Sequence, residues 1–172
     1  MQQISRLAVE VVHVSRTYDL SANDFIAAFE SMLGTFERDA LMVMRVDPAA
    51  AARQLETTQG PHGLMLFDKL DHGVLFAMAG EERVAFRYHV GNPLVAWRMT
   101  RIDMRAALYA PLTVLIEGAS KGQTRVEYDL PSSVLGQFGI DSIRAIAFEL
   151  DDRLDAVING AAKSVAARVS DR

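Results

Sequence analysis

Asp71 and His72 are the neighbouring side chains best suited to chemistry, because they place a carboxylate beside an imidazole. Such a pair can move protons in general acid–base catalysis or contribute to a metal site. His89 is a third candidate on a nearby predicted strand. If the strands adjoin, His72 and His89 could bind a metal together with Glu127 or Asp129.

A structural role explains the same pair. Neighbours on a strand face opposite sides of the sheet, and Gly73 indicates a tight turn in which Asp71 and His72 cap backbone groups. The sequence contains no short-range metal-ligand motif such as HExxH, so we expect no metal site. The residues assign no cofactor. Asp71, His72 and His89 therefore remain weak catalytic candidates.

The segment Gly91-Asn92-Pro93 has two interpretations. The N-terminus of a helix offers free N–H groups and a positive dipole end to an anion, so Asn92 is a candidate ligand-binding residue. The segment lacks the several glycines and the lysine of a phosphate-binding loop. A helix start explains all three residues, with glycine in the turn, asparagine at the N-cap and proline at the first helical position.

The helix predicted after Pro93 carries the clearest charge cluster of the chain. Arg98, Arg101 and Arg105 follow the helical period and could bind an anionic ligand or an acidic partner. A solvated basic face gives the same pattern. Trp97 lies at the flank of this stripe, where it could line a pocket, close an interface or simply pack.

Composition narrows the classes of function. The 172-residue chain has no cysteine, which excludes disulfides, thiol nucleophiles and zinc sites built on cysteine. A formal net charge of −4 disfavours general attraction to nucleic acid or anionic membranes. The apolar run near the start contains Glu10 and His13 and lacks a cleavage site, so we expect no secretion signal. No uncharged apolar run approaches the roughly 18 residues of a membrane span, and we expect a cytoplasmic protein.

Hydrophobic periodicity predicts one α+β domain over residues 1–172. Strands joined by hairpins, with helices set to one side, indicate an antiparallel sheet of about five to six strands with helices packed on one face and a long C-terminal helix. The apolar runs interpreted as strands are 7–14, 40–46, 63–70, 73–80, 82–90, 112–117 and 124–129. The predicted helices are 21–36, 48–59, 93–106 and a final helix from Asp141 or Ser142.

Three segments in order carry a family resemblance: FDKLDHG at 67–73, VGNPL at 90–94 followed by Met99, and YAPLTVLIE at 109–117 with TRVEYDLPSS at 124–133. Together they resemble DUF302, a domain of unknown function. The resemblance implies a two-layer domain of the TATA-binding-protein-like type, with a curved antiparallel sheet backed by helices. It implies no catalytic activity. Some members carry a cysteine near the strand after the helix, and this chain has none there.

The leading hypothesis is a non-catalytic domain that binds a small molecule or regulates, with an apolar pocket between sheet and helices. Eight methionines and eight phenylalanines favour such a lining, although core packing uses the same residues. The alternatives are an enzyme centred on Asp71, His72 and His89, and a homodimeric interaction protein joined through a sheet edge or the final helix. The expected pocket residues are Phe86, Tyr88, Trp97, Met99 and Tyr128.

Overall fold

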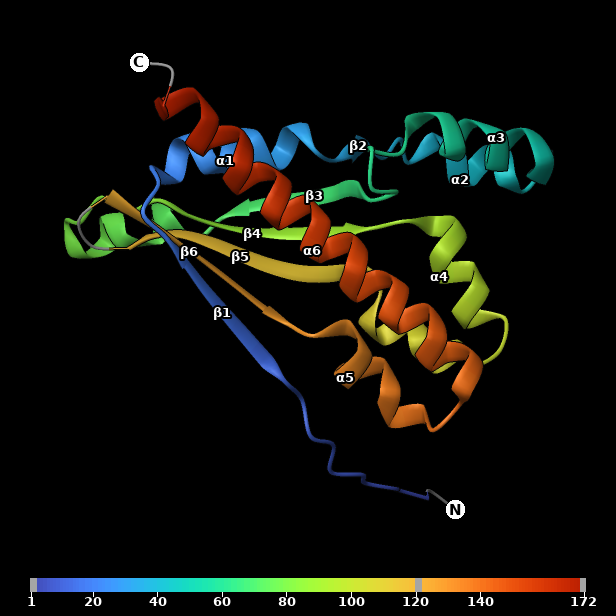
Figure 1. The fold of residues 1–172 in the computed structure, drawn as a ribbon. Helices are drawn as coiled ribbons and strands as arrows, with labels where there is room; N and C mark the ends of the chain where they lie inside the picture. Colours follow the sequence, from blue (N-terminus) through green and yellow to red (C-terminus); the bar gives the residue numbers. More distant parts are fainter. Residues whose placement is uncertain (1–2, 120–121, 171–172) are drawn as a thin grey trace.

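A six-stranded sheet organises the computed structural model, which describes residues 3–119 and 122–170 (Figure 1). The strand order is β1-β6-β5-β4-β3-β2, and every pair is antiparallel except β2 with β3. The α+β prediction and the curved, mostly antiparallel sheet are confirmed. The strands are β1 His13–Tyr18, β2 Gly34–Thr35, β3 Met65–Asp71, β4 Ala85–Gly91, β5 Leu112–Ala119 and β6 Gln123–Asp129.

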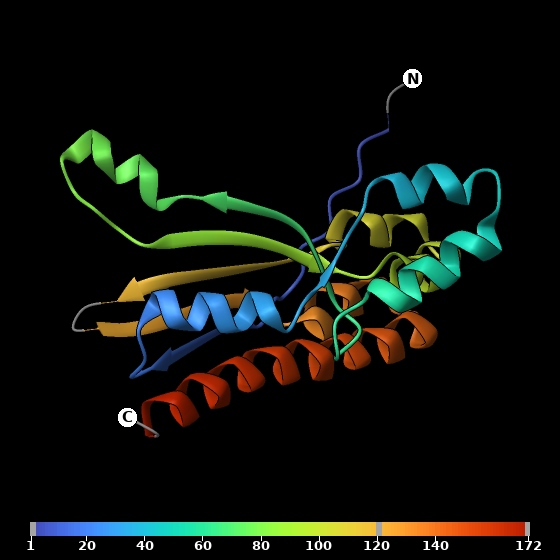
Figure 2. The ribbon, with the colours of Figure 1, turned by 90° about the horizontal axis from the view of Figure 1, so that it is seen from above.

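Helices cover one face of this sheet and one of its ends (Figure 2). α1 (Ala22–Ser31) and the long α6 (Asp141–Ser170) lie across the face, and α2 (Asp39–Met44) and α3 (Pro48–Thr58) lie beyond one end. None of the helices in the described ranges is long and apolar enough to cross a membrane. The remaining helical segments are α4 Pro93–Thr100, α5 Pro131–Leu135 and the 3₁₀ segments η1 Gly73–Ala79, η2 Met104–Tyr109 and η4 Gly136–Phe138.

Local capping chemistry starts three of these helices where the sequence predicts. The hydroxyl of Ser21 accepts the N–H of Asp24 at 3.5 Å, and the carboxylate of Asp47 accepts the N–H of Ala50 at 2.9 Å. Asn92 does the same for Leu94. Each side chain satisfies a backbone donor that has no partner inside its helix.

The core lies between the sheet and α1 with α6. α6 buries a helical series of apolar side chains along its length, as its spacing predicts, and these residues pack on the inward positions of β4, β5 and β6. The largest fully buried side chains of this core are Phe25, Phe29, Leu64, Tyr88, Met99, Ile116, Leu135, Ile143, Leu154 and Ile158.

Two apolar runs interpreted as strands are helical, and those predictions are wrong. The run at 40–46 forms most of α2, and the run at 73–80 forms η1. Alanine, leucine and methionine favour helix, and a short apolar run does not reveal its period. Both segments leave large side chains in solvent, including Met42 and Met78.

Three element boundaries also differ clearly from the prediction. The strand expected over 7–14 begins only at His13, because residues 3–12 have no neighbouring strand. The helix expected over 93–106 ends at Thr100, and Asp103 then starts η2 by accepting the N–H of Arg105 at 2.9 Å. The helix expected over 21–36 ends at Ser31, so Phe36 lies beyond α1.

Candidate ligand-binding site

Asn92 joins β4 to α4 and is buried, with 4% of its surface exposed. Its Oδ1 accepts the N–H of Leu94 at 2.9 Å. Its Nδ2 donates to Gln59 Oε1 and to the carbonyl of Gly63, each at 2.9 Å. Both amide hydrogens are used, so Asn92 fastens the start of α4 to the segment after α3. The predicted helix cap is confirmed.

A cavity of about 270 Å³ lies beside this cap, between α2, α4 and the adjoining ends of β3 and β5. One wall is the stacked pair Phe36 and Phe67, whose ring centroids are 4.1 Å apart. Met99 contributes to the lining from the buried side of α4. Further apolar lining comes from Leu41, Met44, Val95, Ala96 and Leu112.

Trp97 also lines the cavity, although 61% of its surface is exposed to solvent. The indole therefore extends from the cavity to solvent. The Arg101 guanidinium lies over the ring at 5.0 Å from its centroid, which holds the indole by a cation–π contact. Trp97 is thus placed where a bound molecule would alter its surroundings.

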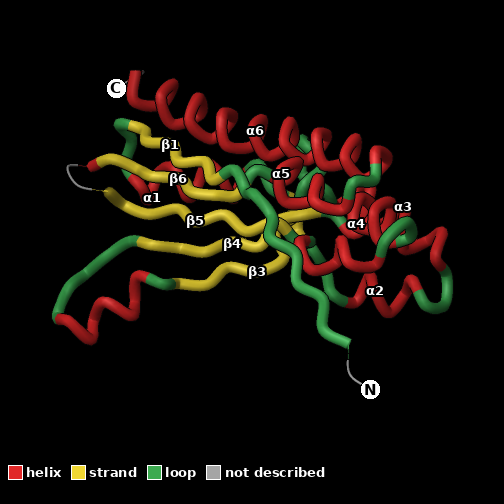
Figure 3. The backbone as a smooth tube through the Cα atoms, turned by 90° about the horizontal axis from the view of Figure 1, so that it is seen from below, coloured by secondary structure: helices red, strands yellow, loops and turns green. Residues whose placement is uncertain are grey.

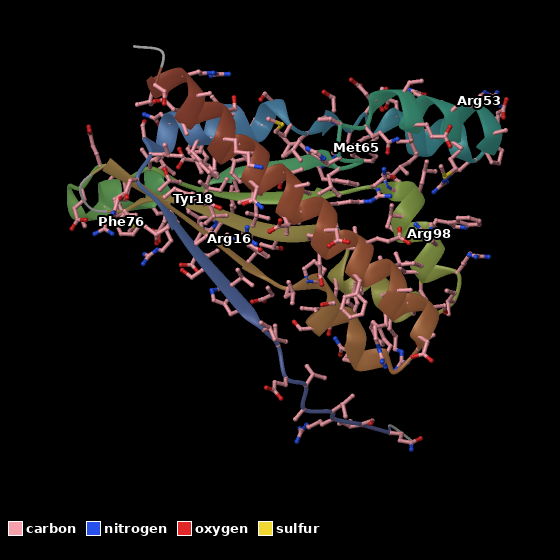
Figure 4. All side chains as sticks on the ribbon, in the orientation of Figure 1. Arg16, Tyr18, Arg53, Met65, Phe76 and Arg98 are labelled. Carbon is pink, nitrogen blue, oxygen red and sulfur yellow. The ribbon has the colours of Figure 1, made fainter. Side chains whose placement is uncertain are left out.

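The three arginines expected to form one stripe have separate partners, and only Arg98 lies within α4. Arg98 donates from Nη1 and Nη2 to both carboxylate oxygens of Glu149 on α6, at 2.7 and 2.8 Å, and Figure 4 shows it pointing from α4 toward α6. This bidentate pair raises the pKa of Arg98 and lowers that of Glu149. Arg105 pairs with Asp103 at 2.6 Å. Arg98 therefore ties α4 to α6, whereas Arg105 pairs with Asp103 at the start of η2. The three arginines do not form one unpaired basic surface.

The other expected pocket residues lie elsewhere. Tyr88 is fully buried and donates its hydroxyl to Glu30 Oε1 at 2.7 Å. The pKa of Tyr88 is raised mainly by burial and further by the Glu30 carboxylate. Phe86 lies under the Lys69 ammonium, 4.2 Å from its ring centroid. Tyr128 accepts from Arg16 at 2.8 Å. The structure therefore brings Trp97, Met99 and Asn92 to the cavity and places these three rings in the sheet layer.

The candidate catalytic residues do not converge. Asp71 accepts the N–H of Val74 at 3.1 Å, which is the capping role that the following glycine indicates. The N–H of His72 donates to Ala85, and its Nε2 is buried without a partner among the described residues. Ala85 precedes His89 by four residues on β4, so the backbone positions of the two histidines are about 13 Å apart along the strand direction.

Strand pairing places Asp71 on the opposite face from His72. Asp71 is paired with Phe86 on the helix-covered face, whereas the neighbouring His72 and His89 belong to the open face. Within the ranges 3–119 and 122–170, no group of three or more histidine or acidic side chains could hold a metal ion.

His13 is a polar site that sequence reasoning missed. Its Nδ1 lies 2.8 Å from Asp129 Oδ1 and its Nε2 lies 2.7 Å from Glu127 Oε2, on the face of the sheet without helices. These hydrogen bonds raise the pKa of His13, and the bond to Asp129 has the largest effect. Only the alternation of His13, Ser15 and Thr17 hinted at this face, and their partners are more than 100 residues away in sequence.

Comparisons with known proteins agree with the fold. The structure is similar to the crystal structure of an uncharacterized conserved DUF302 protein from Bacillus stearothermophilus, with a TM-score of 0.61 and 14% identity over 87% of this chain and 97% of that chain. No curated protein matches the sequence significantly. The model of the family described as domain of unknown function DUF302 matches residues 41–161, more than half of the chain. The chain therefore belongs to the DUF302 family.

Proposed function

We propose that the protein binds a small apolar molecule in the cavity beside α4 and acts as a binding or regulatory module without catalysis. The observation that carries this proposal is the cavity lining, which is almost wholly apolar and includes an indole that reaches solvent. Ligand sites are typically apolar hollows with few polar groups. The candidate catalytic side chains Asp71, His72 and His89 do not meet there or elsewhere.

The cavity also limits the class of ligand. Its volume of about 270 Å³ is near the lower end of common ligand pockets, which begin at roughly 300 Å³. An apolar cavity of about 150 Å³ is enough to bind benzene. Since no charged side chain lines the cavity, we expect an uncharged ligand with one or two aromatic rings or a short acyl chain.

Trp97 provides the test, because it is the only tryptophan of the chain. We expect toluene and n-octanol to change its fluorescence emission in a saturable way and to raise the midpoint of thermal unfolding. Ala96→Leu should fill the cavity and weaken binding at least about tenfold, since the added methylene groups take the space of the ligand. Ala77→Leu, at an exposed position on η1, is the matched control and should bind as the unaltered chain does.

The result would count against the proposal in two cases. Emission that changes only linearly with either probe means that no specific site exists. Equal affinity in Ala96→Leu and the unaltered chain means that the probe binds outside this cavity.

A further inference from the structure

Residues 3–12 form an extended segment, here called the arm, that projects from the sheet into solvent (Figure 1, Figure 3). In the described part of the chain, its hydrogen bonds to the body are at Val12, whose N–H donates to Ser133 Oγ and whose carbonyl accepts from Leu130. The arm is nevertheless apolar: Leu7 is 76% exposed and Ile4 is 69% exposed. Val9, Val11 and Val12 are also exposed.

Apart from Val12, the arm makes no hydrogen bond to the body among the described residues, and its side chains are exposed. The arm continues directly into β1, which is the outermost strand of the sheet. Its valines favour a strand, and only the absence of a neighbouring strand leaves it irregular. An exposed apolar segment that prolongs a sheet edge readily pairs with another strand.

We propose that the arm pairs with the arm of a second copy of this chain, as an antiparallel ribbon with its two-fold axis at Ala8. In this register, the numbers of two residues that face each other across the ribbon add up to 16. Arg6 then lies opposite Glu10 of the second copy, and the symmetry repeats the pair. Because the sum also sets residue 3 beside His13, the ribbon continues into the free edge of β1.

The charges select this register over its neighbours. An axis at residue 6 would place Arg6 opposite its own copy, and an axis at residue 10 would do the same for Glu10. If the facing residue numbers add up to 14 or 18 instead, Arg6 and Glu10 both lie opposite apolar or small side chains. A register shift of one residue turns the apolar side chains of one arm to the opposite face of the ribbon.

The same register pairs the apolar side chains. Leu7 faces Val9 of the second copy on one side of the ribbon, and Ile4 faces Val12 on the other. The five exposed apolar residues of the arm thereby gain neighbours from the second copy. A ribbon of two strands is marginal in isolation, and its continuity with two six-stranded sheets supplies the needed support. This dimer is independent of the cavity beside α4.

Sedimentation of the full chain over a range of concentrations tests the dimer. We expect a dimer that Leu7→Lys combined with Val9→Lys weakens at least about 100-fold, because the apolar pairs are lost. Met42→Lys, on the exposed side of α2, is the matched control and should leave the dimer intact. The body should stay folded in every variant, as its helical circular dichroism would show, because the arm and Met42 lie outside the core.

Charge exchange and a cysteine test the register. Arg6→Glu or Glu10→Arg alone should weaken the dimer about tenfold by opposing like charges, and the double exchange should restore it. The chain has no cysteine, so Ala8→Cys should form a disulfide-linked dimer on mild oxidation and Val12→Cys should not. A monomer at every concentration, or a dimer indifferent to the lysine substitutions, overturns the proposal. A double exchange that fails to restore the dimer overturns the register.

Discussion

On the face that α1 and α6 cover, the central strands present Tyr88, Val114 and Tyr128, which lie side by side across β4, β5 and β6. On the opposite face, the same strands present the neighbouring Arg87 and Leu115 with Glu127. The two faces alternate residue by residue, so the backbone contributes equally to both. Their difference therefore lies in what the side chains contact.

Removal from water explains that difference. Polar groups on the covered face have fixed partners, as Thr124 shows: it is fully buried, and its hydroxyl donates to the carbonyl of Leu20 at 2.7 Å. The open face carries ion pairs, including Arg125 with Glu117, that water and salt can replace. We infer that stability depends on the covered face and that the open face responds to solution conditions.

Truncation of one leucine on each side should give the largest contrast. Leu154 on α6 is fully buried, so Leu154→Ala leaves a cavity and should lower the free energy of unfolding by about 2–5 kcal/mol. Leu115→Ala makes the same chemical change on the open face, where the side chain is half-buried, and should lower it by about 1 kcal/mol or less. Urea denaturation measures both. Equal losses would show that the open face is packed by a partner.

Hydroxyl removal should give a smaller contrast in the same direction. Tyr88→Phe removes a buried hydroxyl that donates to Glu30 and should lower the free energy of unfolding by about 1 kcal/mol, since Lys69 still pairs with that carboxylate. Ser15→Ala removes a hydroxyl that donates to Glu127 on the open face and should change it by less than about 0.5 kcal/mol. A larger effect at Ser15 would contradict the comparison.

The ionisation of the Tyr88 phenol should also make stability depend on alkaline pH. Burial and the Glu30 carboxylate raise the pKa of its phenol in the folded chain above the unfolded value of about 10. Above that unfolded value, the unfolded chain loses this proton while the folded chain keeps it, so stability falls as pH rises. In Tyr88→Phe the unfolding midpoint should fall less steeply above pH 10. Identical slopes would mean that Tyr88 ionises in the folded chain.

Features set by local chemistry could be predicted from the sequence. Ser21, Asp47 and Asn92 cap their helices through backbone groups two or three residues away, so neighbouring residue types are enough to find them. The covered and open faces of β4 follow from simple alternation. α2 could not be distinguished from a strand, because its apolar run has the length of either element.

Only part of the candidate site could be predicted, because local patterns find residues on one helix but not contacts between distant segments. Trp97 and Met99 share α4 with the Asn92 cap, so their position followed from the helix. Phe36 and Phe67 form the facing wall because β2 pairs in parallel with the first residues of β3, which places Phe36 beside Phe67. The His13 cluster depends on the pairing of β1 with β6, which joins residues 116 positions apart. Such long-range contacts leave no local pattern.

The smallest effect should appear when pH changes the charge of His13. Its two carboxylate partners raise its pKa above the unfolded value of about 6.5, so its stabilisation is complete below that pH and is lost as pH rises through the folded pKa. The NMR titration midpoint of His13, assigned by its loss in His13→Gln, should lie above 6.5 and fall toward it in 1 M salt. The effect on unfolding should be small, because the imidazole is 60% exposed. A midpoint at or below 6.5 would mean that the carboxylates do not hold the ring in solution, and the open face would then lose its clearest response to pH.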